Sequence, residues 1–201
     1  MAMANLVAGL SPVRYMNGTP WNGGGNVYVI PSTDTNAYAI GDPVALSGTG
    51  DGNGVPAITL ASAGTSGIVL GPVVSTGGLV NGGAYVDPAQ PNTTIIPATK
   101  TKDYYVLVCD DPNVLFRIQD SGDGTAFAAT DIGSNANLKS GTNTGYVSGW
   151  SLTDTGVGTS ASLQVKLMGL DYTVQGNTFG QYAQWLVRIN THQFAAGVAG
   201  V

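Results

Sequence analysis

The chain has 201 residues, which is enough for one large domain or two small ones with a sizeable core. Hydrophobic residues make up 43% of it and charged residues only 9%, a balance that excludes intrinsic disorder of the whole chain. The net charge of −5 and the scattering of 7 basic residues argue against nucleic acid as a partner.

The surface is expected to be poor in charge. A monomer of this size exposes roughly 8,800 Å², so 7 basic and 12 acidic side chains leave about 460 Å² for each charge. All the acidic residues are Asp and 30 residues are Gly, so helix formers for exposed faces are scarce and turn formers are abundant. We therefore expect an all-β protein with little helix, much of whose surface is covered by a partner.

In chain order, the sequence predicts an extended N-terminal arm over residues 1–25, a β-rich domain over 26–194 and a C-terminal tail over 195–201. The arm carries apolar side chains without a period of 2 or 3.6 and ends in Trp-Asn-Gly-Gly-Gly. Such a segment suits a groove on a neighbouring protein. The candidate interface residues are its large apolar side chains: Leu6, Val7, Leu10, Val13, Met16 and Trp21.

The domain itself is predicted to be a single β-sandwich or a jelly-roll or barrel-like fold. Short strand candidates bounded by Gly, Pro, Asn or Asp recur along it. The first five are 26–30, 37–40, 43–46, 57–61 and 67–75.

A central strand is predicted at 104–109, because this run is apolar on both faces. The residues 110–113 (Asp-Asp-Pro-Asn) then suggest a tight hairpin turn into a strand at 114–120, whose apolar residues alternate as in a half-buried strand. A short helix or irregular loop is expected within 125–138. Two further strands are predicted at 162–170 and 183–190.

Residues for catalysis are scarce. Cys109 lies within an apolar run, where a buried inert thiol is expected. His192 is the one histidine, so a zinc site of several His and Cys ligands is excluded by count, and the chain has no Gly-x-Ser-x-Gly motif to support a Ser-His-Asp triad. We expect His192 to have a structural or interface role, and the protein to have no catalytic residues and no cofactor.

The close aspartate pairs, Asp110 with Asp111 and Asp120 with Asp123, are better explained by turn chemistry than by glycosidase chemistry. The segments 51–54 and 120–124 are faintly similar to calcium loops. Because the chain has no Glu to complete such a loop, a surface calcium is the most they could hold.

Targeting signals are not expected. Residues 1–10 lack the basic start and the apolar length of a signal peptide, and no run of 18 apolar residues occurs. The expectation is a protein made in the cytoplasm that does not enter a membrane.

Several segments, read in order, are similar to those of a known group of proteins. They are 9–14, 19–22, 40–44, 110–117, 131–138 and 185–190 with His192. Together they resemble tailed-bacteriophage capsid decoration (cement) proteins. The resemblance implies a β-rich accessory protein on the outer surface of an icosahedral head, which binds the major capsid protein as a dimer or trimer and carries no catalytic residues.

Two other interpretations stay open. One is a free β-sandwich whose surface is polar without charge. The other is a receptor- or carbohydrate-binding module of a phage fibre or spike, which exposed aromatic side chains would mark. The candidates, each of which is also placed to pack in a core, are Tyr28, Tyr38, Tyr85, Trp150 and Tyr172.

Overall fold

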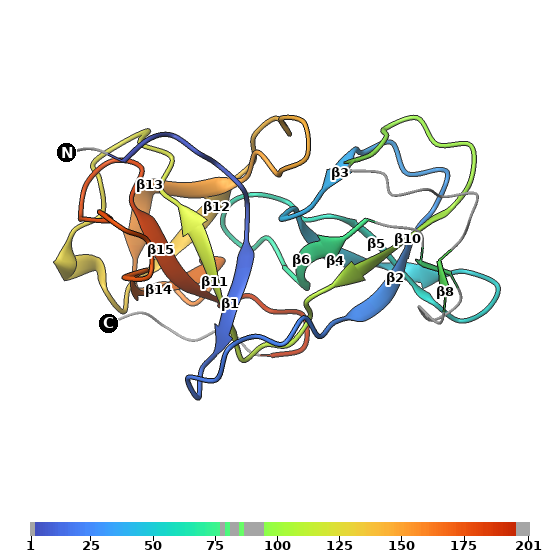
Figure 1. Ribbon diagram of the computed structural model, residues 1–201, viewed down its shortest axis with the longest axis horizontal. Helices are drawn as coiled ribbons and strands as arrows, with labels where there is room; N and C mark the ends of the chain where they lie inside the picture. Colours follow the sequence, from blue (N-terminus) through green and yellow to red (C-terminus); the bar gives the residue numbers. More distant parts are fainter. Residues whose placement is uncertain (1–2, 77–78, 81–84, 87–94, 196–201) are drawn as a thin grey trace.

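The protein is built almost entirely of β-strands (Figure 1). The computed structural model describes residues 3–76, 79–80, 85–86 and 95–195. Within these residues, the one helical element is a 3-10 turn at Ala129–Asp131. The prediction of an all-β protein with little helix is confirmed.

The strands form two lobes that lie side by side along the long axis of the molecule (Figure 1). The sheet lobe is a six-stranded antiparallel sheet in the order β1 (Ser11–Tyr15), β11 (Val114–Gln119), β15 (Gln184–Ile189), β14 (Val165–Leu170), β12 (Asn135–Lys139) and β13 (Ser151–Gly158). The barrel lobe is a closed barrel in the order β10 (Tyr104–Val108), β2 (Asn26–Ile30), β5 (Pro56–Leu60), β4 (Pro43–Gly50) and β6 (Gly71–Ser75).

Two small strand pairs accompany the barrel lobe. They are β3 (Tyr38–Ala39) with β9 (Ile95–Ile96), and β7 (Leu79–Val80) with β8 (Tyr85–Val86). The predicted C-terminal tail of 195–201 lies outside the described residues from position 196 onward.

Each lobe has its own hydrophobic core. In the sheet lobe, Phe116 and Trp185 are buried, and Phe127 meets the Trp185 ring edge-on with 5.4 Å between ring centroids. In the barrel lobe, Ile30 and Val106 are fully buried. Burial of one such side chain contributes roughly 1.5–3 kcal/mol to the stability of the fold. Segments with alternating apolar residues therefore form strands whose apolar face lies in one of the two cores.

The predicted hairpin at 110–113 is wrong. A turn is present, with the Val114 amide donating to the Asp111 carbonyl at 3.2 Å, but the strands on its two sides do not pair. Strand β10 pairs with β2 and β6 in one lobe, whereas β11 pairs with β1 and β15 in the other. Because both edges of each strand are already occupied, the turn serves as a connection between lobes.

The lobes are also joined near the end of the described chain. The Val69 amide donates to the Thr191 carbonyl at 3.1 Å, and the Gln193 amide donates to the Val69 carbonyl at 3.0 Å. The Gln193 side chain accepts a hydrogen bond from the Leu46 amide at 2.8 Å. The segment after β15 therefore ties the sheet lobe to the barrel lobe through backbone groups and the Gln193 side chain.

The expectation that residues 1–25 form an arm apart from the domain is wrong for its middle part. Residues 11–15 are strand β1, paired with β11, and Leu10 is 1% exposed in the sheet-lobe core. Gly9 has a positive φ of 65°, and a Cβ there would lie 2.3 Å from the Gly41 carbonyl oxygen. The sequence pattern did not reveal this packing, because a single short edge strand has too few residues for the alternation of apolar side chains to be recognised.

Candidate partner-binding surface

Residues 3–8, which we call the strap, run over the sheet lobe before β1 begins. The Gln119 side chain at the end of β11 holds them: its Oε1 accepts the Leu6 amide and its Nε2 donates to the Ala4 carbonyl, both at 2.8 Å. Gln119 is 2% exposed and also donates to the Tyr182 carbonyl at 2.9 Å. The Gln119 side chain thus provides the strap with the donor and the acceptor that the backbone of a neighbouring strand would provide in a sheet.

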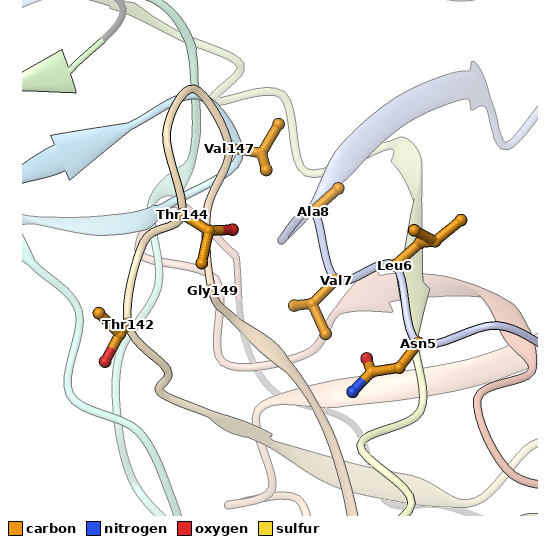
Figure 2. Close-up of a pocket in the computed structure, with 8 residues that line it drawn as sticks. All are labelled: Asn5, Leu6, Val7, Ala8, Thr142, Thr144, Val147 and Gly149. Atoms are coloured by element: carbon orange, nitrogen blue, oxygen red, sulfur yellow. The ribbon is translucent and has the colours of Figure 1, made fainter.

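A cavity of about 550 Å³ separates the strap from the loop between β12 and β13 (Figure 2). Its lining contains no charged side chain and consists of Asn5, Leu6, Val7, Ala8, Thr142, Thr144, Val147 and Gly149. On the other side of the strap, a second cavity of about 230 Å³ shares Leu6 and Ala8 with the first. The strap is therefore flanked by hollows on both sides.

Apolar side chains are exposed around the larger cavity. Leu6 is 71% exposed, and Val147 and Ile40 are also exposed. Val147 and Ile40 are joined by a parallel β-bridge, so loop residues of the two lobes meet here. We call Leu6, Val7, Ile40 and Val147 the strap surface. Large uncharged hollows with exposed apolar side chains are typical of places where another molecule binds.

The six predicted interface residues do not form one surface. Leu6 and Val7 lie at the strap surface, whereas Leu10 belongs to the core. Val13 and Trp21 are half-buried, and Trp21 packs against the sheet-lobe core. Met16 is exposed but lines a separate cavity.

Sequence reasoning missed Ile40 and Val147 as surface residues. The sequence feature that indicates Val147 is the apolar pair Tyr146-Val147 inside the segment 139–149. This segment is polar and rich in Gly, as surface loops are, so its apolar side chains are expected at the surface. Tyr146 is 67% exposed. The proximity of Ile40 and Val147 to the strap could not be inferred from the sequence. These residues are far apart in the chain and come together only when the two lobes pack against each other.

Three of the aromatic residues proposed for carbohydrate binding are in the cores. Tyr28, Tyr38 and Trp150 are almost completely buried, so they present no face to a sugar. Tyr172 is 79% exposed. The side chain of Tyr85 lies outside the described residues.

The nucleophile and base candidates are both buried. Burial raises the pKa of the Cys109 thiol to about 12, so it stays protonated at neutral pH. His192 is 3% exposed, and burial lowers the pKa of its imidazole. Its Nδ1 accepts the Phe194 amide at 3.0 Å. His192 lies at the junction of the lobes, where it forms a parallel β-bridge with Val69.

Asp51 and Asp111 stabilise their own turns, whereas Asp110 accepts hydrogen bonds from the distant side chains of Asn26 and Tyr28. In the loop 51–54, Asp51 Oδ1 accepts the amides of Asn53 and Val55, both at 2.8 Å. Asp111 Oδ1 accepts the Asn113 amide at 2.8 Å in the same manner. Among the described residues, no three His, Cys or acidic side chains are arranged to hold a metal ion.

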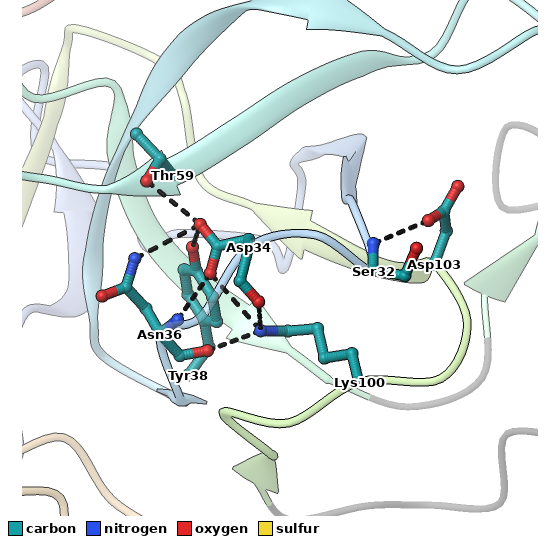
Figure 3. Close-up of polar contacts among 7 residues, drawn as sticks. All are labelled: Ser32, Asp34, Asn36, Tyr38, Thr59, Lys100 and Asp103. Atoms are coloured by element: carbon teal, nitrogen blue, oxygen red, sulfur yellow. Dashed lines mark hydrogen bonds and ion pairs between the residues drawn. The ribbon is translucent and has the colours of Figure 1, made fainter.

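A buried ion pair organises the outer end of the barrel lobe (Figure 3). Lys100 Nζ donates to the carbonyl oxygens of Asp34 and Asn36 at 2.8 and 2.6 Å and lies 3.3 Å from Asp34 Oδ1. Asp34 Oδ2 accepts the Tyr38 and Thr59 hydroxyls at 2.9 and 3.2 Å. With every strong donor and acceptor matched, this group fixes the loop 31–38 rather than offering a free binding group.

The described residues include no helix long and apolar enough to cross a membrane. Comparisons with protein-family models, with curated proteins and with solved structures give no match to this chain.

Proposed function

We propose that this protein decorates and stabilises an icosahedral phage head from its outer surface by binding the major capsid protein through the strap surface. The observation that carries the proposal is the uncharged cavity beside Leu6 and Val7, bordered by the exposed Ile40 and Val147. An interface built on it depends on apolar and backbone contacts, since charge is depleted at interface cores. The resemblance to decoration proteins supports the same role.

Decoration would stabilise the shell by mass action. A protein that binds only the assembled state raises the stability of that state in proportion to the logarithm of its concentration. We further propose that the protein acts as a dimer or trimer that bridges neighbouring capsid subunits. No nucleic acid, membrane or cofactor takes part in this proposal.

The test measures the resistance of heads to heat and osmotic shock with and without added protein. We expect wild-type protein to protect heads at 0.1 M and at 1 M salt, because apolar attachment persists while charge attraction is screened. Leu6→Asp and Val147→Asp should abolish protection. Ile132→Asp, which adds the same charge at a half-exposed apolar residue outside the cavity, should leave it intact.

Two results would contradict the proposal. Equal resistance with and without the protein would remove the stabilising role. Specific binding of the protein to glycans or host cells, unaffected by Leu6→Asp, would favour the receptor-binding interpretation instead.

A further inference from the structure

The edge strand β13 of the sheet lobe is covered by the segment 120–124, which follows β11. Asp120 forms a parallel β-bridge with Leu152, and the Ser121 amide donates to the Leu152 carbonyl at 2.8 Å. We call this contact between residues 120–124 and β13 the seam. It joins the end of a central strand to the outermost strand of the sheet.

Three carboxyl groups meet at the seam: Asp120, Asp123 and Asp154. Asp120 is fully buried, and its Oδ2 has no hydrogen-bond partner. Asp154 is 7% exposed, and neither of its buried oxygens receives a hydrogen bond from a donor group of the described residues. The backbone packs directly on this group, since a Cβ on Gly124 would lie 2.7 Å from Asp154 Oδ1.

Among the residues that the structure describes, one cation pairs with this group of three carboxyls. Lys139 Nζ lies 2.7 Å from Asp123 Oδ2, and this pair is partly exposed. Asp123 also accepts hydrogen bonds from the hydroxyls of Ser121 and Thr153. Within the described part of the chain, Asp154 and Asp120 have no cation of their own, and a buried unpaired carboxylate is strongly unfavourable.

One proton shared between two of these carboxyls removes a buried negative charge. Two ionised carboxylates can only accept hydrogen bonds, so Asp154 and Asp123 can bond to each other only when one of them is protonated. We propose that the seam is a proton-binding latch: Asp154 takes a proton from solvent and donates it to Asp123, and loss of that proton loosens the contact between residues 120–124 and β13. This inference is independent of the proposed function.

The surroundings explain which carboxyl keeps the proton. Burial raises the pKa of Asp154 to about 6, and the neighbouring Asp123 and Asp120 add to this shift. For Asp123, burial acts upward, but the hydrogen bond proposed from Asp154 and the hydrogen bonds from Lys139 and Ser121 outweigh it and hold its pKa below the usual range. Two adjacent carboxyls with separated pKa values behave as one proton-sharing pair.

The sign of the stability effect follows from linkage. Because the pKa of Asp154 is higher in the folded protein than in the unfolded chain, its stabilising contribution is complete below about pH 4 and is lost as pH rises through about 6. Burial lowers the pKa of His192 in the folded protein, so its contribution to stability changes with pH in the opposite sense. A comparison with Asp154→Asn separates the two, because the variant keeps His192 and replaces the proton donor with a permanent amide donor.

The experiment is urea unfolding of the wild type and Asp154→Asn between pH 5 and pH 8. The folded-to-unfolded ratio of the wild type, relative to the variant, should fall about tenfold over this range. Asp103→Asn removes an exposed carboxyl in the other lobe and should reproduce the wild-type profile.

Carboxyl ¹³C NMR of the wild type tests the same proposal without a variant. One signal of the Asp123–Asp154 pair should titrate near pH 6. Titration of both groups below about pH 4.5 would overturn the proposal, as would parallel pH profiles for the wild type and Asp154→Asn. A shift of these signals on adding 1 mM CaCl₂ at pH 8, reversed by EDTA, would show that the seam holds a cation instead of a proton.

Discussion

Gln119 and Leu6, which are 113 residues apart in the chain, are joined by a hydrogen bond of 2.8 Å from the Leu6 amide to Gln119 Oε1. The same side chain donates to the Ala4 carbonyl, so one buried amide holds two backbone groups of the strap. The strap is thereby held in place as one wall of a cavity.

This relationship predicts the effect of Gln119→Leu. The substitution keeps the size of the side chain and removes both strap hydrogen bonds, at a cost of about 0.5–1.5 kcal/mol for each bond. Hydrogen exchange at the Leu6 amide should accelerate, while exchange within β11 stays slow. Unchanged protection at Leu6 would show that the strap is held by other contacts.

Two truncations should differ sharply. Removal of residues 1–8 leaves Leu10 and β1 in place, so the protein should fold with its Tm little changed. Removal of residues 1–15 deletes β1 and opens the sheet-lobe core, which should prevent cooperative unfolding of that lobe. Leu10→Ala provides an intermediate case, with an expected loss of about 2–5 kcal/mol measured by urea unfolding. A stable fold after removal of residues 1–15 would contradict the role of β1.

The buried ion pair predicts a large effect from Lys100→Met. The Lys100 side chain is fully buried and that of Asp34 nearly so, so removal of the cation leaves a desolvated carboxylate without its charge partner. A loss of about 3–5 kcal/mol is expected in urea unfolding. Lys102→Met makes the same chemical change at a half-buried lysine of the same segment and should cost far less. Equal losses would show that Asp34 does not depend on Lys100.

The buried imidazole predicts acid sensitivity of the lobe junction. Burial lowers the pKa of His192 in the folded protein, so the unfolded chain binds the proton more readily. The stabilising contribution of neutral His192 is present above the ordinary value of 6.5 and is lost as pH falls below it. The difference in unfolding free energy between the wild type and His192→Gln should therefore shrink from pH 8 to pH 5. A difference that grows toward acid pH would contradict this position for His192.

Much of the secondary structure could be predicted from local pattern. The strand expected at 26–30 coincides with β2, and the strand expected at 114–120 differs from β11 by one residue. Strand β13 was missed because Ser151–Gly158 contains an Asp and two Gly, residues that are depleted in strands. It is a strand because β12 pairs with it.

The sequence by itself determined that this protein is all-β and poor in charge, because these properties follow from composition and from short-range alternation. Only the tertiary structure decided that the strands divide between two lobes, that Leu10 enters a core, and that the strap meets Val147. Each of these depends on pairing between distant segments, and the choice of partner is set by which strand edges and apolar faces remain open once the rest of the chain has folded.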